Sequence, residues 1–249
     1  MQKAGPIALF VTCVNDAVFP ETGKAVVRIL ERIGQRVVFP AEQTCCGQMH
    51  LNTGYRDEAL ALARRFVTVF SPFETIVVPS ASCGGTIVDT YLHLAEEAGD
   101  ERLRRALTDL APRVHELTEL LVDVLGVIDV GASFPHRVAY HPTCHSLRVL
   151  KLGDRPIRLL QGVHGLQLMA FEDETSCCGF GGTFSIKNPE VSVAMVQDKL
   201  ACVKRSGAEV LCAADNSCLA HIGGAASRLS SGLRTMHLAE ILAAQEGAQ

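Results

Sequence analysis

The stretch Thr175-Ser-Cys177-Cys178-Gly179-Phe-Gly181-Gly182 places two adjacent cysteines directly before a glycine-rich segment. A second copy of its centre, Thr44-Cys45-Cys46-Gly47, lies 132 residues upstream (177 − 45 = 132), about half the length of the 249-residue chain. Such an offset indicates one duplication into two long units rather than a short-period solenoid. We therefore expect two similar halves, each built to present an adjacent pair of cysteines.

Other cysteines keep nearly the same offset. In the first half, one cysteine precedes the pair by 32 positions and another follows it by 37; in the second half the corresponding separations are 33 and 40. Each half thus has the pattern C…CCG…C, and eight of the ten cysteines form two matched sets: Cys13, Cys45, Cys46 and Cys83, then Cys144, Cys177, Cys178 and Cys218. Cys202 and Cys212 have no counterpart and are interpreted as small buried hydrophobic residues.

The composition is that of a globular protein, with 48% apolar and 20% charged residues. The net charge of −4 and the lack of a basic run give no electrostatic case for binding nucleic acid or an anionic membrane. No apolar stretch reaches the roughly 18 to 20 residues that span a bilayer, and the first apolar run has an internal counterpart, so it is interpreted as a strand rather than a leader. A cytoplasmic location is expected, where clustered cysteines are more often metal ligands or catalytic groups than disulfides.

Short apolar strands alternate with amphipathic helices in both halves. We expect strands near 6–13, 36–39, 75–79, 138–141, 166–171 and 209–213, and helices near 20–33, 55–70, 89–110, 116–125, 156–162 and 189–206. This alternation predicts an α/β protein with two pseudo-symmetric, Rossmann-like βαβ halves, each a parallel sheet with helices on both faces. The short Gly/Ser/Pro segment 131–134 is the expected joint, which divides the chain into residues 1–130 and 131–249.

All eight matched cysteines fall at or just after an expected strand end. Parallel sheets bind ligands beyond the carboxyl ends of their strands, so each set of four should converge at one sheet edge. Thiolates bind zinc, or iron in an iron–sulfur cluster. Adjacent cysteines can reach two atoms of a polynuclear cluster but chelate one tetrahedral ion awkwardly, which favours a cluster while zinc stays open.

The glycines after each pair are expected to belong to the same sites. Gly47, Gly179, Gly181 and Gly182 let the backbone approach closely and can direct N–H groups at sulfur. Three histidines, His141, His145 and His221, flank the second set of cysteines, and their first-half counterparts are not histidines. Whether they act at the metal or only hydrogen bond nearby is open, but the asymmetry points to a more specialised second site.

The doubled C…CCG…C pattern resembles the cysteine-rich (CCG) domain of a heterodisulfide reductase subunit and its relatives, which include iron–sulfur subunits of glycolate oxidase and anaerobic glycerol-3-phosphate dehydrogenase. The residues around Cys13 (with Phe19-Pro20), Pro142-x-Cys144-His145 and Asp215-Asn-Ser-Cys218-Leu-Ala-His221-Ile222 are most similar to a stand-alone, lactate-utilising branch of that family. The resemblance covers nearly the whole chain. It implies one or two iron–sulfur clusters and a subunit of an oxidoreductase complex that converts L-lactate to pyruvate.

The resemblance also implies partners: a ferredoxin-containing iron–sulfur protein and a third small subunit. In the heterodisulfide reductase protein the last motif element is C-x-x-C, whereas one cysteine of that pair stands in each half here, leaving four ligands per half, enough for an ordinary [4Fe–4S] cluster. The chain has no ferredoxin-type C-x2-C-x2-C-x3-C-P run and no G-x-G-x-x-G, so electrons must be exchanged with a partner chain. The competing function is a zinc-binding or metal-free docking module without a redox role.

Overall fold

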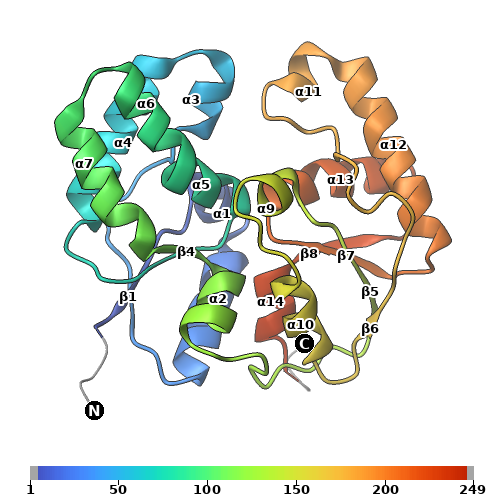
Figure 1. The fold of residues 1–249 in the computed structure, drawn as a ribbon. Coiled ribbons are helices and arrows are strands. Elements are labelled where there is room, and N and C mark those ends of the chain that lie inside the picture. The colour runs from blue at the N-terminus through green and yellow to red at the C-terminus, as the bar shows by residue number, and fades with distance from the viewer. Residues whose placement is uncertain (1–4, 246–249) are drawn as a thin grey trace.

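The computed structural model describes residues 5–245, which form two four-stranded, fully parallel sheets (Figure 1). The first sheet has the order β2-β1-β3-β4, with β1 at Ile7–Leu9, β2 at Val37–Val38, β3 at Ile76–Val78 and β4 at Val114–Glu116. The second sheet repeats it as β6-β5-β7-β8, with β5 at Arg137–Tyr140, β6 at Gln167–Leu168, β7 at Val210–Ala213 and β8 at Arg234–His237. The predicted α/β class and the two similar halves are confirmed.

Helices cover both faces of each sheet. In the first half they are α1 (Cys13–Val18), α2 (Pro20–Arg32), α3 (Gln48–Thr53), α4 (Arg56–Phe70), α5 (Ala81–Gly85), α6 (Tyr91–Glu97), α7 (Glu101–Leu110) and α8 (Leu117–Glu119), with π-helical turns η1 (Thr86–Thr90) and η3 (Leu120–Val124) and a 3-10 turn η2 (Ala111–Arg113). In the second half they are α9 (Cys144–Arg148), α10 (Arg155–Gln161), α11 (Phe184–Lys187), α12 (Pro189–Arg205), α13 (Asn216–Arg228) and α14 (Leu238–Ala243).

Side chains alternate along the strands between two separate layers of core. In β1 and just after it, Leu9 joins a central cluster, whereas Phe10 joins an outer cluster against α4, α6 and α7. The second sheet repeats the alternation, with Val138 in the central cluster and Ala139 in an outer cluster against α12 and α13. This period of two is expected for strands that are buried on both faces.

The central core is shared by the two halves. It contains Leu30 of α2 and Leu121 from the first half together with Leu160 of α10 and Leu242 of α14 from the second. Figure 1 shows α2, α10 and α14 lying between the two sheets. The buried faces of α2 and α14 thus complete one core, and neither sheet has a separate inner layer of its own.

Most predicted strands and helices are present, with shorter strands than expected. Two strands were missed, β4 and β8, each directly before the similar segments Leu117–Leu121 and Leu238–Leu242. The helices α13 and α14 and the short helices α1, α3, α5, α9 and α11 were also not predicted. Stretch 89–110 was expected to be one helix, but it is divided at Gly99, whose φ of +64° ends α6, and Asp100 accepts a hydrogen bond from the Leu103 amide to begin α7. Within residues 5–245 no helix combines the length and hydropathy needed to traverse a bilayer.

Candidate metal centres

The first set of cysteines lies at the carboxyl-terminal edge of the first sheet. Cys13 begins α1 after β1, Cys45 and Cys46 lie in the loop between β2 and α3, and Cys83 lies in α5 after β3. Strand β1 lies between β2 and β3 in the sheet. The chain first moves from β1 to β2 on one side and then crosses back to β3 on the other side of β1. This is the switch point at which open parallel sheets bind ligands.

Four sulfur atoms meet at this edge. The Cys13 Sγ lies 3.5 Å from the Cys45 Sγ, and the Cys46 Sγ lies 3.1 Å from the Cys83 Sγ. These separations far exceed a disulfide bond of about 2.05 Å, so the thiols are free. Cys46 and Cys83 are buried, whereas Cys13 is exposed. The group is therefore closed toward the outer core and open on the side of α1.

The second set repeats the arrangement at the edge of the second sheet. Cys144 begins α9 after β5, Cys177 and Cys178 follow β6, and Cys218 lies in the first turn of α13 after β7. The Cys144 thiol hydrogen bonds to Cys177, and Cys178 interacts in the same way with Cys218. Cys178 is buried and the other three are partly exposed. All eight cysteines thus lie in two groups of four, as the strand ends predicted.

The first glycine after each pair contacts sulfur through its amide. The Gly47 N–H donates to the Cys45 Sγ over 3.3 Å, and the Gly179 N–H donates to the Cys177 Sγ over 3.4 Å. Both glycines have a left-handed backbone, with φ of +78° and +87°. Gly181 and Gly182 lie further along in a second left-handed turn, and Gly182 packs against α3 of the other half.

The hydrogen bonds among the thiols divide their proton affinities unequally. The thiol of Cys13 donates to Cys45, which lowers the pKa of Cys45 to about 2 and raises that of Cys13. In the second group the Cys144 thiol likewise lowers the pKa of Cys177 to about 2. The amides of Gly47 and Gly179 act in the same direction as they also donate to these sulfurs. Each centre therefore favours a thiolate at the first cysteine of its adjacent pair, the form that binds metals.

The three histidines occupy different positions around the second centre. A ring nitrogen of His141 and the Sγ atoms of Cys178 and Cys218 all lie within 4.8 Å of one another. His145 lies between the halves, with its Nε2 3.1 Å from the Gln48 Nε2 of α3. The Nε2 of His221 lies 3.2 Å from the Ser192 Oγ, and that hydroxyl donates to the Gly179 carbonyl. Only His141 of these three shares a group with the sulfur atoms.

A buried polar network that joins the two halves was not predicted. The carboxylate of Asp215 accepts hydrogen bonds from the Ser82 amide at 2.7 Å, the Ser82 hydroxyl at 3.0 Å and the Ser80 hydroxyl at 3.1 Å. Beside it, the side-chain amide of Asn216 donates to the Asn15 side-chain oxygen at 3.0 Å. Ser82 is next to Cys83, and Asn216 and Asn15 are each two residues from Cys218 and Cys13, so both centres are attached to one buried interface.

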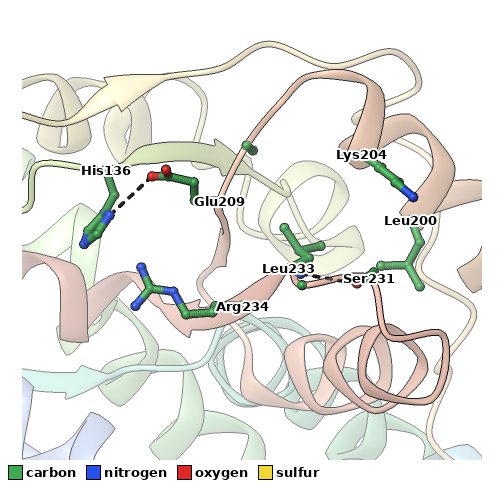
Figure 2. Close-up of a pocket in the computed structure, with 9 residues that line it drawn as sticks. His136, Leu200, Lys204, Glu209, Ser231, Leu233 and Arg234 are labelled. Atoms are coloured by element: carbon green, nitrogen blue, oxygen red, sulfur yellow. Dashed lines mark hydrogen bonds and ion pairs between the residues drawn. The ribbon is translucent and has the colours of Figure 1, made fainter.

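One cavity of the second half lies away from the sulfur atoms. It has a volume of about 420 Å³ and is lined by His136, Glu209 and Arg234, among others. Figure 2 shows the dashed contact between His136 and Glu209, which joins the Nδ1 and Oε2 atoms over 3.3 Å. These residues precede or begin β5, β7 and β8, so the cavity is at the amino-terminal edge of the sheet. It is therefore not part of either centre.

The chain matches the family model of the cysteine-rich CCG domain twice, over residues 7–88 and 138–223. It is 46% identical over 236 residues to "Lactate utilization protein A" of Oceanobacillus iheyensis, covering 95% of this chain and 96% of the relative. Proteins of the same name from an Exiguobacterium species and Bacillus subtilis are 45% and 42% identical, covering 95% of this chain and 96% and 98% of their own lengths. Glutamate racemase from Francisella tularensis gives a TM-score of 0.35 at 9% identity, covering 98% of this chain and 79% of that protein.

Proposed function

Because the chain belongs to the family of cysteine-rich CCG-domain proteins, we propose that it is an iron–sulfur subunit of a cytoplasmic complex that oxidises L-lactate to pyruvate. The observation that carries this proposal is the convergence of four free cysteines at the carboxyl edge of each sheet. The name of the relatives, lactate utilization protein A, supports lactate as the substrate of the system in which the chain takes part.

The residues at each centre fit an iron–sulfur cluster. Cys13, Cys45, Cys46 and Cys83 would hold one, and Cys144, Cys177, Cys178 and Cys218 another, each of the [4Fe–4S] type. A bound cluster supplies one-electron transfer. The chain's own part is to fix the sulfur ligands, to donate N–H groups from Gly47 and Gly179 to them, and to exclude water around Cys46 and Cys178. Amide bonds to ligand sulfur and burial both tune the potential of such a group.

Partner chains are needed in this proposal because the sequence contains no ferredoxin-type cysteine run and no dinucleotide motif. We propose a ferredoxin-domain iron–sulfur protein and a third small subunit as those partners. The exposed Cys13 places the open side of the first centre near α1, where a partner's cluster could approach. Shape and burial thus leave a route for electrons that does not cross the shared core.

A zinc-binding module is the second candidate, favoured by one observation. Tetrahedral zinc with sulfur ligands at about 2.3 Å would keep its sulfur atoms roughly 3.8 Å apart. The Sγ separations of 3.5 Å and 3.1 Å in the first centre are closer to this spacing than to the wider one around a four-iron cube. With zinc bound, the centres would stabilise the fold and the chain would serve to dock its partners.

Metal analysis of protein purified without oxygen separates the two candidates. We expect roughly four to eight iron atoms per chain with matching sulfide, and a brown colour from thiolate-to-iron charge transfer. Replacing Cys202, which lies outside both sets, with serine should leave this content unchanged, whereas Cys178→Ser should lower it. One or two zinc atoms per chain without iron or sulfide would overturn the electron-transfer proposal and leave the docking module.

A further inference from the structure

The two centres differ at one buried position. His141 stands three residues before Cys144, directly after β5, and Phe10 stands three residues before Cys13, directly after β1. Phe10 packs its ring edge-on against Phe66 at 5.4 Å within the apolar cluster that includes Cys46. At the same place in the second half, an imidazole replaces a phenyl ring beside the sulfur atoms.

The imidazole of His141 has one ring nitrogen bonded and one free. Its Nδ1 lies 3.4 Å from the carbonyl oxygen of Glu174, and its Nε2 is buried without a hydrogen-bond partner among the described residues. The residue is 1% exposed, so no solvent compensates the free nitrogen. Burying a polar atom without a partner costs about 1–3 kcal/mol, so a bare Nε2 at this place destabilises the fold unless it binds a ligand.

The hydrogen bond to the Glu174 carbonyl determines which ring nitrogen of His141 carries the proton. A carbonyl oxygen only accepts, so the Nδ1 of His141 must hold the hydrogen, and Nε2 of the neutral ring then presents a lone pair. A lone pair cannot donate a hydrogen bond to sulfur, but it can bind a metal. An N–H to carbonyl bond on the far ring nitrogen is also the usual way in which proteins orient a metal-binding histidine.

A second position near the sulfur atoms also changes from an apolar residue in the first half to a polar residue in the second half. Gly47 contacts Ala59 of α4 and Gly179 contacts Ser192 of α12; seven residues further along these equivalent helices stand Phe66 and Lys199 (59 to 66, 192 to 199). The Nζ of Lys199 donates to the Glu174 carbonyl at 2.9 Å and to the Asp173 carbonyl at 2.8 Å. The apolar pair Phe10 and Phe66 is thus replaced by His141 and the lysine that holds its carbonyl partner.

We propose that the Nε2 of His141 is a metal ligand of the second centre, at the position shared with Cys178 and Cys218. The inference rests on the proposed function only in requiring a metal at that centre. The nitrogen is a ligand beside the four thiolates of the second set, so the second centre has a neutral donor that the first centre lacks. The two centres of the duplicated chain are then chemically different.

Nitrogen coupling to the metal tests this assignment. The background variant is Cys46→Ser, which removes the first centre and with it any signal from His50, which lies near Cys45. Protein with 15N-labelled histidine is loaded with iron and sulfide, reduced, and measured by pulsed EPR. We expect a histidine nitrogen coupling that disappears in His141→Phe, which installs the residue of the first half, and that persists in the matched control His221→Phe.

Metal content, measured on the same samples, separates the two proposals. If the second centre takes zinc instead of iron, the proposed function fails, and the nitrogen coupling is then read on the cobalt(II)-loaded protein. Absence of a histidine coupling in the labelled, metal-loaded chain would overturn the ligand assignment, as would a coupling that survives in His141→Phe. The labelled background chain, with histidine retained, gives a result even where the phenylalanine variant does not fold.

Discussion

Gly179→Ala tests whether the CCG loops need their glycines for space as well as for backbone conformation. The loop holds Gly179 at a φ of +87°, and a β-carbon there would lie 2.7 Å from the Ser192 carbonyl oxygen and 3.0 Å from the Met195 β-carbon. Neither neighbour is the end of a flexible side chain. The substitution therefore has to move α12 or the loop that carries Cys177 and Cys178.

Alanine substitutions at two other glycines separate the backbone cost of a left-handed alanine from the steric cost of its β-carbon. Gly207, after α12, has a φ of +73° and nothing within 4 Å of an added β-carbon, so Gly207→Ala measures the backbone cost alone, about 1–2 kcal/mol. Gly47→Ala would place its β-carbon 3.2 Å from the Leu62 Cδ1, a side-chain end that can move, and 3.4 Å from the Ala59 Cα. Overpacking adds about 1–3 kcal/mol where the neighbours cannot yield. The expected order of destabilisation is Gly207→Ala, then Gly47→Ala, then Gly179→Ala at about 2–5 kcal/mol.

The assay is urea unfolding followed by circular dichroism, with the metal content of each variant measured in parallel. Because the Gly179 N–H also donates to the Cys177 Sγ, Gly179→Ala should lower metal loading of the second centre while Gly207→Ala leaves it intact. The reasoning is refuted if Gly179→Ala and Gly207→Ala are destabilised equally, because the backbone cost would then account for both.

Three further predictions concern the centres and the interface between the halves. Cys46→Ser and Cys178→Ser should each remove about half of the bound iron, and retention of full iron content in either variant would exclude that cysteine as a ligand. Burial raises the pKa of Glu116 to about 7, so its carboxyl is protonated in the folded state and ionised in the unfolded state between about pH 4.5 and 7, and stability should fall over that range by about 3 kcal/mol. Glu116→Gln should abolish this slope in urea unfolding measured across pH, and an unchanged slope would assign it to other groups. Asp215→Ala leaves the buried Ser82 amide without its acceptor and should cost about 2–4 kcal/mol; a loss below about 1 kcal/mol in the same measurement would show that water replaces the carboxylate.

The sequence predicted the parts of the site that depend on the local chain. Strand ends and the offset between the two CCG motifs were enough to bring Cys13 to Cys45 and Cys144 to Cys177. Glycines after each pair were correctly expected to supply amide donors at Gly47 and Gly179. Lys199 was not found, because it stands among the apolar residues of α12 like any charged side chain on a helix surface. Its role depends on the carbonyl of Glu174, a contact that spacing along one helix cannot show.

The contacts between the halves could not be derived from the duplication because they break its symmetry. Ser80 and Asp215 occupy equivalent positions, each three residues before the last cysteine of its set, and they hydrogen bond to each other over 3.1 Å. Residues near a two-fold axis meet their own counterparts. Two aspartates there would place like charges together in a buried site, and two serines would leave the Ser82 amide without its carboxylate acceptor. A duplicated chain that buries this axis must therefore have different residues in its two halves where the halves touch. For that reason, comparing the two half-sequences could not predict the contacts between them.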